Sequence, residues 1–161
     1  FVGYALEEHE PHKGIIHTSS TRLAKYIKEN AIDYDDRLLL AYGPLRQRNF
    51  QKHMTSSEPT VLVSPSMTEG VDLKGDLARF TIIAKCPFMS LGDERTKKRA
   101  VIDRRWYAMH TIRQIIQACG RGTRTPTDKC VSYVIDEKVK ELLEEYQEVV
   151  PEWFWEAWEE K

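Results

Sequence analysis

Five short apolar runs, separated by longer stretches with helical spacing, most constrain the fold of this chain. The runs are rich in Ile, Val and Leu, and they occupy residues 14–17, 37–41, 60–63, 80–84 and 130–135. Runs of this length, several of them ended by proline or glycine, predict buried strands. Strands that alternate with helices predict an α/β fold with a mostly parallel central sheet flanked by helices in three layers.

Helices are expected between and after these strands, over residues 45–54, 97–120, 138–147 and 152–158 and around Leu23, Ala24 and Ile27. The longest is predicted for residues 97–120, where apolar side chains recur on one stripe. Residues 1–4 are expected to be a strand already under way. In an open parallel sheet, ligands bind beyond the carboxyl ends of the strands, so the polar segments after residues 17 and 63 are candidate sites.

Length and composition fit one globular domain, because 161 residues with 41% hydrophobic side chains can form a sizeable core. The chain begins with Phe1 rather than Met, so we expect residues 1–161 to be a single domain of a larger protein. No apolar run approaches the roughly 20 residues of a membrane span. The three cysteines lack the spacing of a metal site or a disulfide framework. These features predict an intracellular, cytoplasmic protein with no membrane contact and no metal ligands, nucleoid-associated if it is bacterial or from a phage.

The charge is unevenly distributed although the net charge is only −1. Residues 95–124 contain nine basic side chains and one acid, whereas residues 136–161 contain ten acids and three lysines. This asymmetry suits a domain that meets phosphates on one side only. Ordinary solvated helix faces are the alternative.

Gln117, Gly120, Arg121 and Arg124 form the first candidate site. At helical spacing these positions share one face, so the amide and both guanidinium groups are expected to point the same way. Glycine costs about 1 kcal/mol in a helix interior, so Gly120 and Gly122 indicate the close approach of a backbone or a ligand. Fixed guanidinium groups suit nucleotide phosphates. A surface basic cluster at a helix end is the alternative.

The second candidate site follows the strand predicted at residues 60–63. Ser64 and Ser66 can donate to a phosphodiester backbone. Glu69, Gly70 and Asp72 can present a backbone N–H group and carboxylates to a ribose or to the water shell of a metal nucleotide. The alternative is an ordinary polar turn without a ligand.

The third candidate site is the pair of hydroxyls Thr18 and Ser19, which follow the first strand. Hydroxyls at a strand-to-helix junction can contact phosphate together with the N–H groups of the helix terminus. At least one hydroxyl in the segment 18–21 is expected to cap the helix instead.

In this order the segments resemble motifs IV, V and VI of superfamily 2 helicases. The resemblance is to the second motor domain of the XPD-like and DinG-like group, with its Glu-Gly-x-Asp loop, a Pro-Phe after the next strand and Gln-x-x-Gly-Arg-x-x-Arg. It covers most of residues 14–136, with motif IV near residues 15–20, motif V near 61–76, Pro87-Phe88, and motif VI near 117–124.

The resemblance implies a RecA-like fold and a role in an ATP-dependent helicase, for example in DNA repair. Arg121 and Arg124 would then reach the γ-phosphate of ATP, and Gln117 would position the nucleotide or the attacking water. Gly120, Glu69, Gly70 and Asp72 would lie at the nucleotide, and Thr18, Ser19, Ser64 and Ser66 would contact the nucleic acid. The bound nucleic acid is expected to be single-stranded, and DNA rather than RNA.

The chain contains no G-x-x-x-x-G-K-[S/T] loop and no Asp-Glu-x-His or Asp-Glu-x-Asp segment. ATP with Mg²⁺ is therefore expected to be held mainly by an N-terminal RecA-like domain, and the chain alone is expected to be inactive. Two other interpretations remain: a translocase or nuclease-associated subunit that does not unwind, and a non-catalytic α/β nucleic-acid-binding module.

Overall fold

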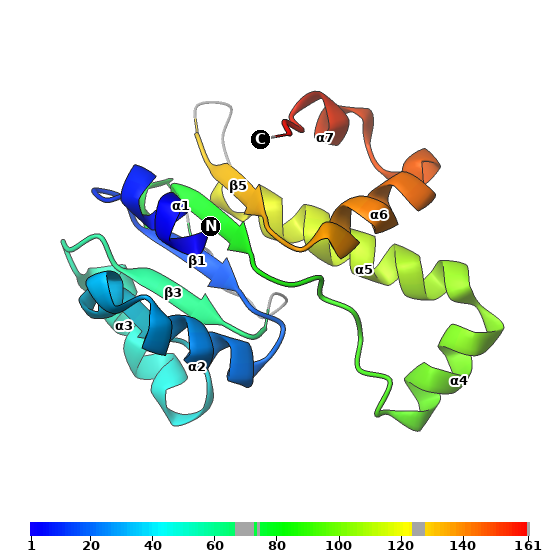
Figure 1. Cartoon of the computed structure of the whole chain (residues 1–161), viewed down its shortest axis with the longest axis horizontal. Helices are drawn as coiled ribbons and strands as arrows, with labels where there is room; N and C mark the ends of the chain where they lie inside the picture. The colour runs from blue at the N-terminus through cyan, green and yellow to red at the C-terminus, as the bar shows by residue number, and fades with distance from the viewer. Residues whose placement is uncertain (67–72, 74, 124–127, 161) are drawn as a thin grey trace.

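The structure is a computed structural model of the chain, and it describes residues 1–66, 73, 75–123 and 128–160. Its centre is a five-stranded sheet in the order β2-β3-β1-β4-β5, and all four pairings are parallel (Figure 1). This confirms the predicted parallel sheet. The strands are β1 (Gly14–His17), β2 (Leu38–Leu40), β3 (Val61–Ser64), β4 (Phe80–Ile83) and β5 (Val131–Val134).

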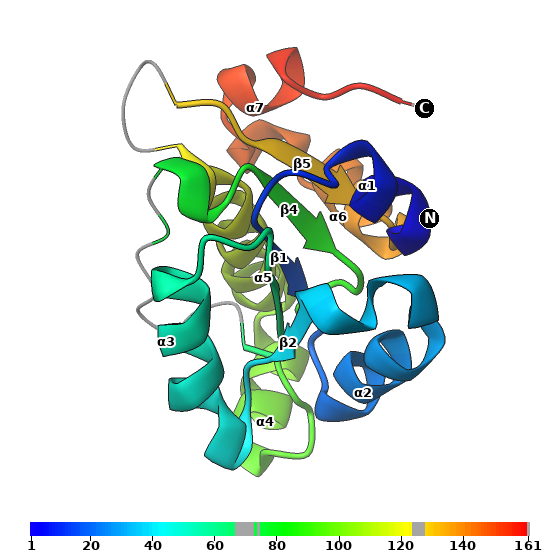
Figure 2. The same cartoon turned by 90° about the vertical axis from the view of Figure 1, so that its left-hand side faces the viewer.

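Helices cover both faces of the sheet (Figure 2). On the first face, α1 (Val2–Glu8) and α2 (Thr21–Asn30) pack on alternate side chains of the strands, such as Ile16, Val63 and Ile82. The β-strand period of two sends the intervening side chains, such as Ile15 and Leu62, to the opposite face. The strands are therefore apolar on both sides, as expected for a parallel sheet covered by helices.

The second face is covered by α3 (Arg46–Thr55) and α5 (Arg104–Cys119). Helices α6 (Glu137–Glu145) and α7 (Glu152–Glu156) pack with α5 in one apolar core that also includes Ile83 of β4. Short 3₁₀ helices complete the described chain: Ile32–Arg37, Gly43–Leu45, Gly75–Leu77, Gly120–Gly122 and Gln147–Val149.

Residues 1–4 are not a strand, so that prediction was wrong. They begin α1, whose residues Val2, Ala5 and Leu6 have the i, i+3, i+4 spacing of one helical face. Ala5 and Leu6 are fully buried against the first face of the sheet, and Val2 packs beside them. Packing of this short apolar face therefore decided the structure of the segment.

The single helix predicted for residues 97–120 is also wrong, because the chain forms two helices there. Helix α4 (Glu94–Ile102) ends before Asp103, and α5 begins after it. The Asp103 backbone lies at φ −133° and ψ 83°, and its Oδ1 accepts from the Trp106 N–H at 2.8 Å. Asp103 is thus an N-cap that interrupts the apolar stripe. Figure 1 shows α4 at the end of α5 that lies away from the sheet.

Candidate functional site

The hydroxyl-bearing segments that follow β1 and β3 meet at the carboxyl edge of the sheet, as their order along the chain predicts. The Thr18 N–H donates to the Ser64 carbonyl at 2.9 Å. The Ser19 hydroxyl donates to the Lys85 carbonyl, also at 2.9 Å, two residues beyond β4. The carboxyl ends of three neighbouring strands are therefore joined by direct hydrogen bonds.

Most of these hydroxyls are already used within the chain. Thr18 is fully buried and donates to the Ser20 carbonyl at 2.9 Å. The Ser64 hydroxyl donates to the Ser66 carbonyl at 3.1 Å and accepts from the Ser66 N–H at 3.3 Å, which forms a polar turn. Thr18 and Ser64 thus shape this edge, while Ser19 and Ser66 are half-buried. The nucleic-acid contacts assigned to the four residues stay predictions.

Ser19 and Ser20 together set the direction of α2. Ser19 has φ 57°, and it is the one non-glycine residue with positive φ in the described part of the chain. This conformation costs on the order of 1–3 kcal/mol, which the neighbouring hydrogen bonds must offset. Ser20 is the N-cap, because its hydroxyl accepts from the Leu23 N–H at 3.2 Å, so one hydroxyl of the segment 18–21 caps the helix as expected. The amino terminus of α2 consequently opens at the carboxyl edge of the sheet.

The segment that contains Gln117 and the arginines leaves the helix earlier than predicted. Helix α5 ends at Cys119, Gly120–Gly122 is a 3₁₀ turn, and Thr123 is extended at φ −118° and ψ 106°. The helical face predicted across residues 117–124 therefore does not continue past Gly122. Gln117 is exposed. For Arg121 the structure describes the backbone, and Arg124 lies outside the described residues.

The small size of glycine is required at Gly122 but not at Gly120. A β-carbon on Gly122 would stand 2.5 Å from the Ala78 carbonyl oxygen and would also overlap the side chain of Cys130. A β-carbon on Gly120 would meet nothing within 4 Å among the described residues. The expected close approach of a backbone is thus confirmed for Gly122 alone.

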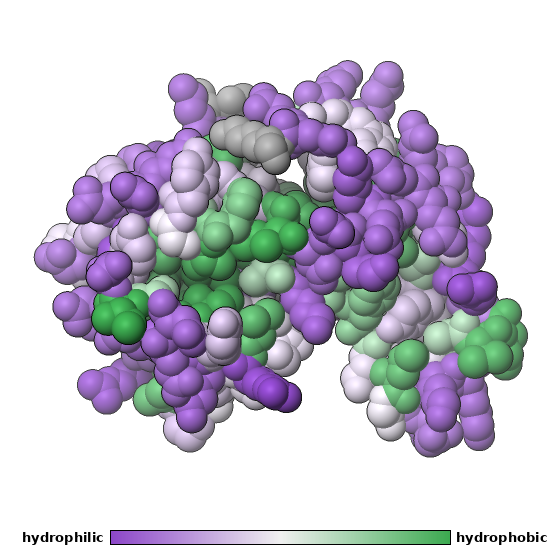
Figure 3. Space-filling view, viewed as in Figure 1, coloured by the Kyte–Doolittle hydropathy of each residue, from purple (hydrophilic) through white to green (hydrophobic). Residues whose placement is uncertain are grey.

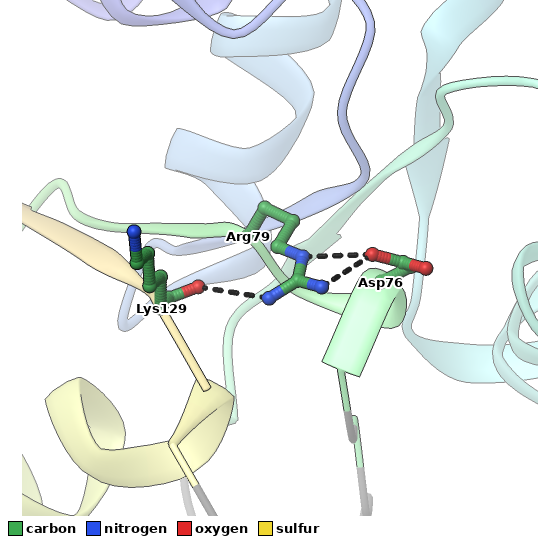
Figure 4. A network of polar contacts seen from close by, with 3 residues as sticks. All are labelled: Asp76, Arg79 and Lys129. Carbon is green, nitrogen blue, oxygen red and sulfur yellow. Dashed lines mark hydrogen bonds and ion pairs between the residues drawn. The ribbon is translucent and has the colours of Figure 1, made fainter. Parts of the chain in front are cut away.

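This contact places the segment at the amino edge of the sheet, because Ala78 precedes β4 and Cys130 precedes β5. A polar network holds the same edge together (Figure 4). The Arg79 guanidinium donates to Asp76 Oδ1 at 2.8 and 2.6 Å and to the Lys129 carbonyl at 3.4 Å. No local sequence pattern marks Arg79, because its partner Lys129 lies 50 residues away.

The arginine segment, residues 117–123, therefore lies at the amino ends of the strands. The hydroxyl cluster, formed by Thr18, Ser19, Ser64 and Ser66, lies at their carboxyl ends. The connection from β3 to β4 runs between these two edges. It carries Glu69, Gly70 and Asp72, which lie outside the described residues. Leu73, which follows them, is fully buried and packs in the same apolar cluster as Ala78.

The three cysteines are free thiols, of which Cys86 is buried and Cys119 and Cys130 are half-buried. Burial raises the pKa of Cys119 to about 11 and that of Cys86 to about 12, and it also raises the pKa of Cys130. Cys119 packs against the core formed by α5, α6 and α7. Within the described ranges there is no group of three or more His, Cys, Asp or Glu side chains able to hold a metal.

The aromatic residues near the carboxyl end mainly pack inside the domain. Phe154 is buried, and Trp155 and Trp158 pack against the same core. Trp153 remains 55% exposed. Among the described helices, none is long and apolar enough to cross a membrane.

Comparison with solved structures shows a RecA-like helicase fold. The C-terminal domain of Dbp5 from S. cerevisiae, bound to Gle1 and IP6, is 14% identical, with a TM-score of 0.62 over 98% of this chain and 78% of that one. A second structure of the C-terminal domain of the DEAD-box protein Dbp5 is 12% identical, with a TM-score of 0.62 over 91% of this chain and 74% of that one. Xpd4 of S. tokodaii is 17% identical, with a TM-score of 0.56 over 94% of this chain and 32% of that one.

A search of curated protein sequences gives no match. The model of the helicase C-terminal domain family, however, matches residues 6–157, which is nearly the whole chain and includes all five strands. The chain therefore belongs to the helicase C-terminal domain family, of the XPD/DinG type.

Proposed function

We propose that this chain is the second motor domain of an ATP-dependent nucleic-acid helicase. In this role Arg121 and Arg124 act as arginine fingers on an ATP–Mg²⁺ complex that an N-terminal RecA-like domain holds. Gln117 and Gly120 lie beside the nucleotide. Glu69, Gly70 and Asp72 link the state of the nucleotide to the binding of the nucleic acid. The carboxyl edge, through Ser19, Ser66 and the amino terminus of α2, contacts single-stranded nucleic acid, with DNA favoured over RNA.

The observation that carries this proposal is the packing of Gly122 against Ala78 and Cys130. An arginine finger contributes on the order of 10³ to 10⁵ in rate, and it does so by stabilising the charge of the transferring phosphoryl group. Such a contribution needs a backbone held in one place. The contact at Gly122 fixes the turn that contains Arg121 to the entries of β4 and β5.

The proposed strand contact is supported by the groups at the carboxyl edge. The amino terminus of α2 offers N–H groups and the positive end of a helix dipole. Helix α4 adds Arg95, Lys97 and Lys98, all exposed, which can displace counterions from a nucleic-acid backbone. The single-stranded nucleic acid can therefore be bound without occupying the amino edge of the sheet, where the arginine segment lies.

The proposal is tested by Arg121→Ala and Arg124→Ala in the protein that carries both motor domains. We expect ATP hydrolysis stimulated by single-stranded DNA to fall on the order of 10³-fold, while the affinity for single-stranded DNA stays within about two-fold. Arg113→Ala is the matched control, because Arg113 is an exposed arginine earlier on α5. Unchanged turnover in the Arg121 and Arg124 variants would refute the arginine-finger role.

A second experiment uses this chain alone. Because the chain contains no phosphate-binding loop, we expect no ATP turnover above a buffer blank, with or without single-stranded DNA. Turnover by the isolated chain that disappears in Arg121→Ala would show that the chain holds a complete site rather than half of one.

A further inference from the structure

The sheet reverses its direction of winding between β1 and β4. From β1 the chain passes through α2, on the first face, to β2, which is one of the two outermost strands of the sheet. From β4 the chain passes through α5, on the second face, to β5, which is the other outermost strand. The connections from these two adjacent strands thus leave on opposite faces, which opens a crevice beyond their carboxyl ends. Open α/β sheets bind ligands at such a switch point.

An open groove of about 610 Å³ lies at this point. Helix α2 contributes Arg22, Leu23 and Tyr26 to one wall, and the chain beyond β4 and β5 contributes Lys85, Ile135 and Asp136 to the other. Figure 3, which is viewed from the same side as Figure 1, shows hydrophobic surface in the middle of the molecule, bordered by hydrophilic side chains.

The lining combines a flat apolar surface with two cations. Tyr26 is 61% exposed, and Leu23 and Ile135 flank the same groove. Arg22 and Lys85 are exposed, and neither forms an ion pair with an acid in the part of the chain that the structure describes. Both lie near the amino terminus of α2, where the helix dipole also favours an anion.

Asp136 does not oppose this arrangement strongly, because both of its oxygens are engaged. Oδ2 accepts from the Cys86 N–H at 2.9 Å, and Oδ1 accepts from the Lys138 N–H at 3.1 Å. The carboxylate therefore ties the chain after β4 to the start of α6 and forms one rim of the groove. Two cations against one engaged carboxylate leave the groove net positive.

We infer that this groove holds one nucleotide unit of the single strand, with its base on Tyr26, Leu23 and Ile135 and its phosphate between Arg22 and Lys85. Aromatic side chains bind the face of any base, so the contact tolerates different sequences. The inference rests on the proposed function and adds that the strand is held by a base as well as by its phosphates. Tyr26 is then the residue that distinguishes a strand with bases from a bare sugar–phosphate chain.

The test compares two fluorescein-labelled oligomers of equal length and phosphate number, oligodeoxythymidine and its fully abasic analogue. Their binding to this chain is measured by fluorescence anisotropy at low salt, for the wild type, Tyr26→Ala, Tyr26→Phe and Arg22→Gln. Tyr4→Ala, at another exposed tyrosine, and Lys25→Gln, at another cation of α2, are the matched controls. Circular dichroism of each variant confirms that α2 is retained.

We expect the wild type to prefer the thymidine oligomer on the order of five-fold or more, as base stacking on an aromatic residue predicts. Tyr26→Ala removes the preference, Tyr26→Phe keeps it, and both controls keep it. Arg22→Gln weakens both oligomers equally and lowers the slope of log affinity against log salt by about one.

Equal affinity of the wild type for the two oligomers overturns the base contact and leaves the proposed phosphate contacts standing. A preference that survives Tyr26→Ala overturns it as well. If the wild type binds neither oligomer, the proposed strand contact fails, and the inference fails with it.

Discussion

The Gly122 backbone lies so close to the Ala78 carbonyl oxygen that a β-carbon at Gly122 would stand 2.5 Å from it. The oxygen belongs to the main chain just before β4, so it cannot move aside as the end of a flexible side chain can. The contact therefore couples the turn Gly120–Gly122 to the sheet. A single added methyl group at Gly122 is therefore expected to disturb this packing.

Gly122→Ala is expected to lower the free energy of unfolding by about 1–3 kcal/mol, the usual cost of inserting a methyl group into a packed site. Urea denaturation followed by circular dichroism measures the loss. Gly120→Ala is the matched control, because Gly120 has φ −77° and no neighbour within 4 Å of a new β-carbon. Equal stability of the two variants would show that the segment moves away from Ala78 at little cost.

His53 is predicted to make the domain less stable as the pH falls. Its ring is fully buried, with Nδ1 at 2.9 Å from the Thr60 hydroxyl and Nε2 at 2.8 Å from the Leu77 carbonyl. Burial lowers the pKa of His53 from 6.5 to about 4. Between these two values the unfolded chain binds a proton that the folded chain does not, so stability is complete above pH 6.5 and is lost as the pH falls toward 4.

The expected loss at pH 5 relative to pH 7.5 is about 2 kcal/mol, obtained from the linkage relation. Urea midpoints measured at both pH values report it. The variant His53→Asn is expected to lose most of the pH dependence, whereas His12→Asn, at an exposed histidine, is expected to keep it. Identical pH profiles for His53→Asn and the wild type would assign the effect to another group.

The sequence predicted the sheet well because buried strands depend on local composition. Each of the five aliphatic runs became a strand within one or two residues of its predicted bounds. The errors fell where a few residues decide between alternatives: Val2, Ala5 and Leu6 were too short a pattern to show a helix, and Asp103 was overlooked as a cap. The signal for the second error was present, since aspartate is one of the residues favoured at the N-cap of a helix.

The candidate site was predicted less completely, because its geometry depends on partners distant in sequence. The order of the motifs located the hydroxyls at the carboxyl edge, but it did not show that Thr18 and Ser64 would use their hydroxyls internally. It also did not show that the arginine segment would lie at the amino edge beside Ala78. Both facts follow from tertiary packing, which a pattern of residue types along the chain does not encode.

Arg37 is expected to be the main polar contributor to the attachment of α1. Its Nε donates to the Pro59 carbonyl at 2.9 Å, Nη1 donates to the Leu6 carbonyl at 2.9 Å, and Nη2 donates to the carbonyls of His9 and His12 at 3.0 and 3.1 Å. Burial lowers the pKa of Arg37, but a guanidinium group stays charged under all native conditions.

Arg37→Lys is expected to lower the free energy of unfolding by about 2–3 kcal/mol, because an ammonium group cannot reproduce the planar fork that reaches four carbonyls. Hydrogen exchange of the α1 amides should accelerate in the same variant. Arg48→Lys, on the exposed surface of α3, is the matched control and should change neither measurement. An Arg37→Lys variant as stable as the wild type would show that apolar packing of Ala5 and Leu6 alone holds α1.

The cysteines are predicted to be unreactive while the domain is folded, since the thiolate is the reactive form and burial raises the pKa of all three thiols. At pH 8, labelling of Cys86 and Cys119 by iodoacetamide should be on the order of 100-fold slower or more in buffer than in guanidinium chloride, as a pKa near 11 or 12 implies. Labelling of Cys130 should also be slower, because burial raises its pKa. Ser90→Cys places an exposed thiol on the same chain as an internal standard for reagent activity. Mass spectrometry of the labelled peptides resolves the three sites separately. Rapid labelling of Cys119 in the folded protein would mean that α5 opens next to Gln117 and Gly120, and it would contradict the fixed turn on which the arginine-finger proposal depends.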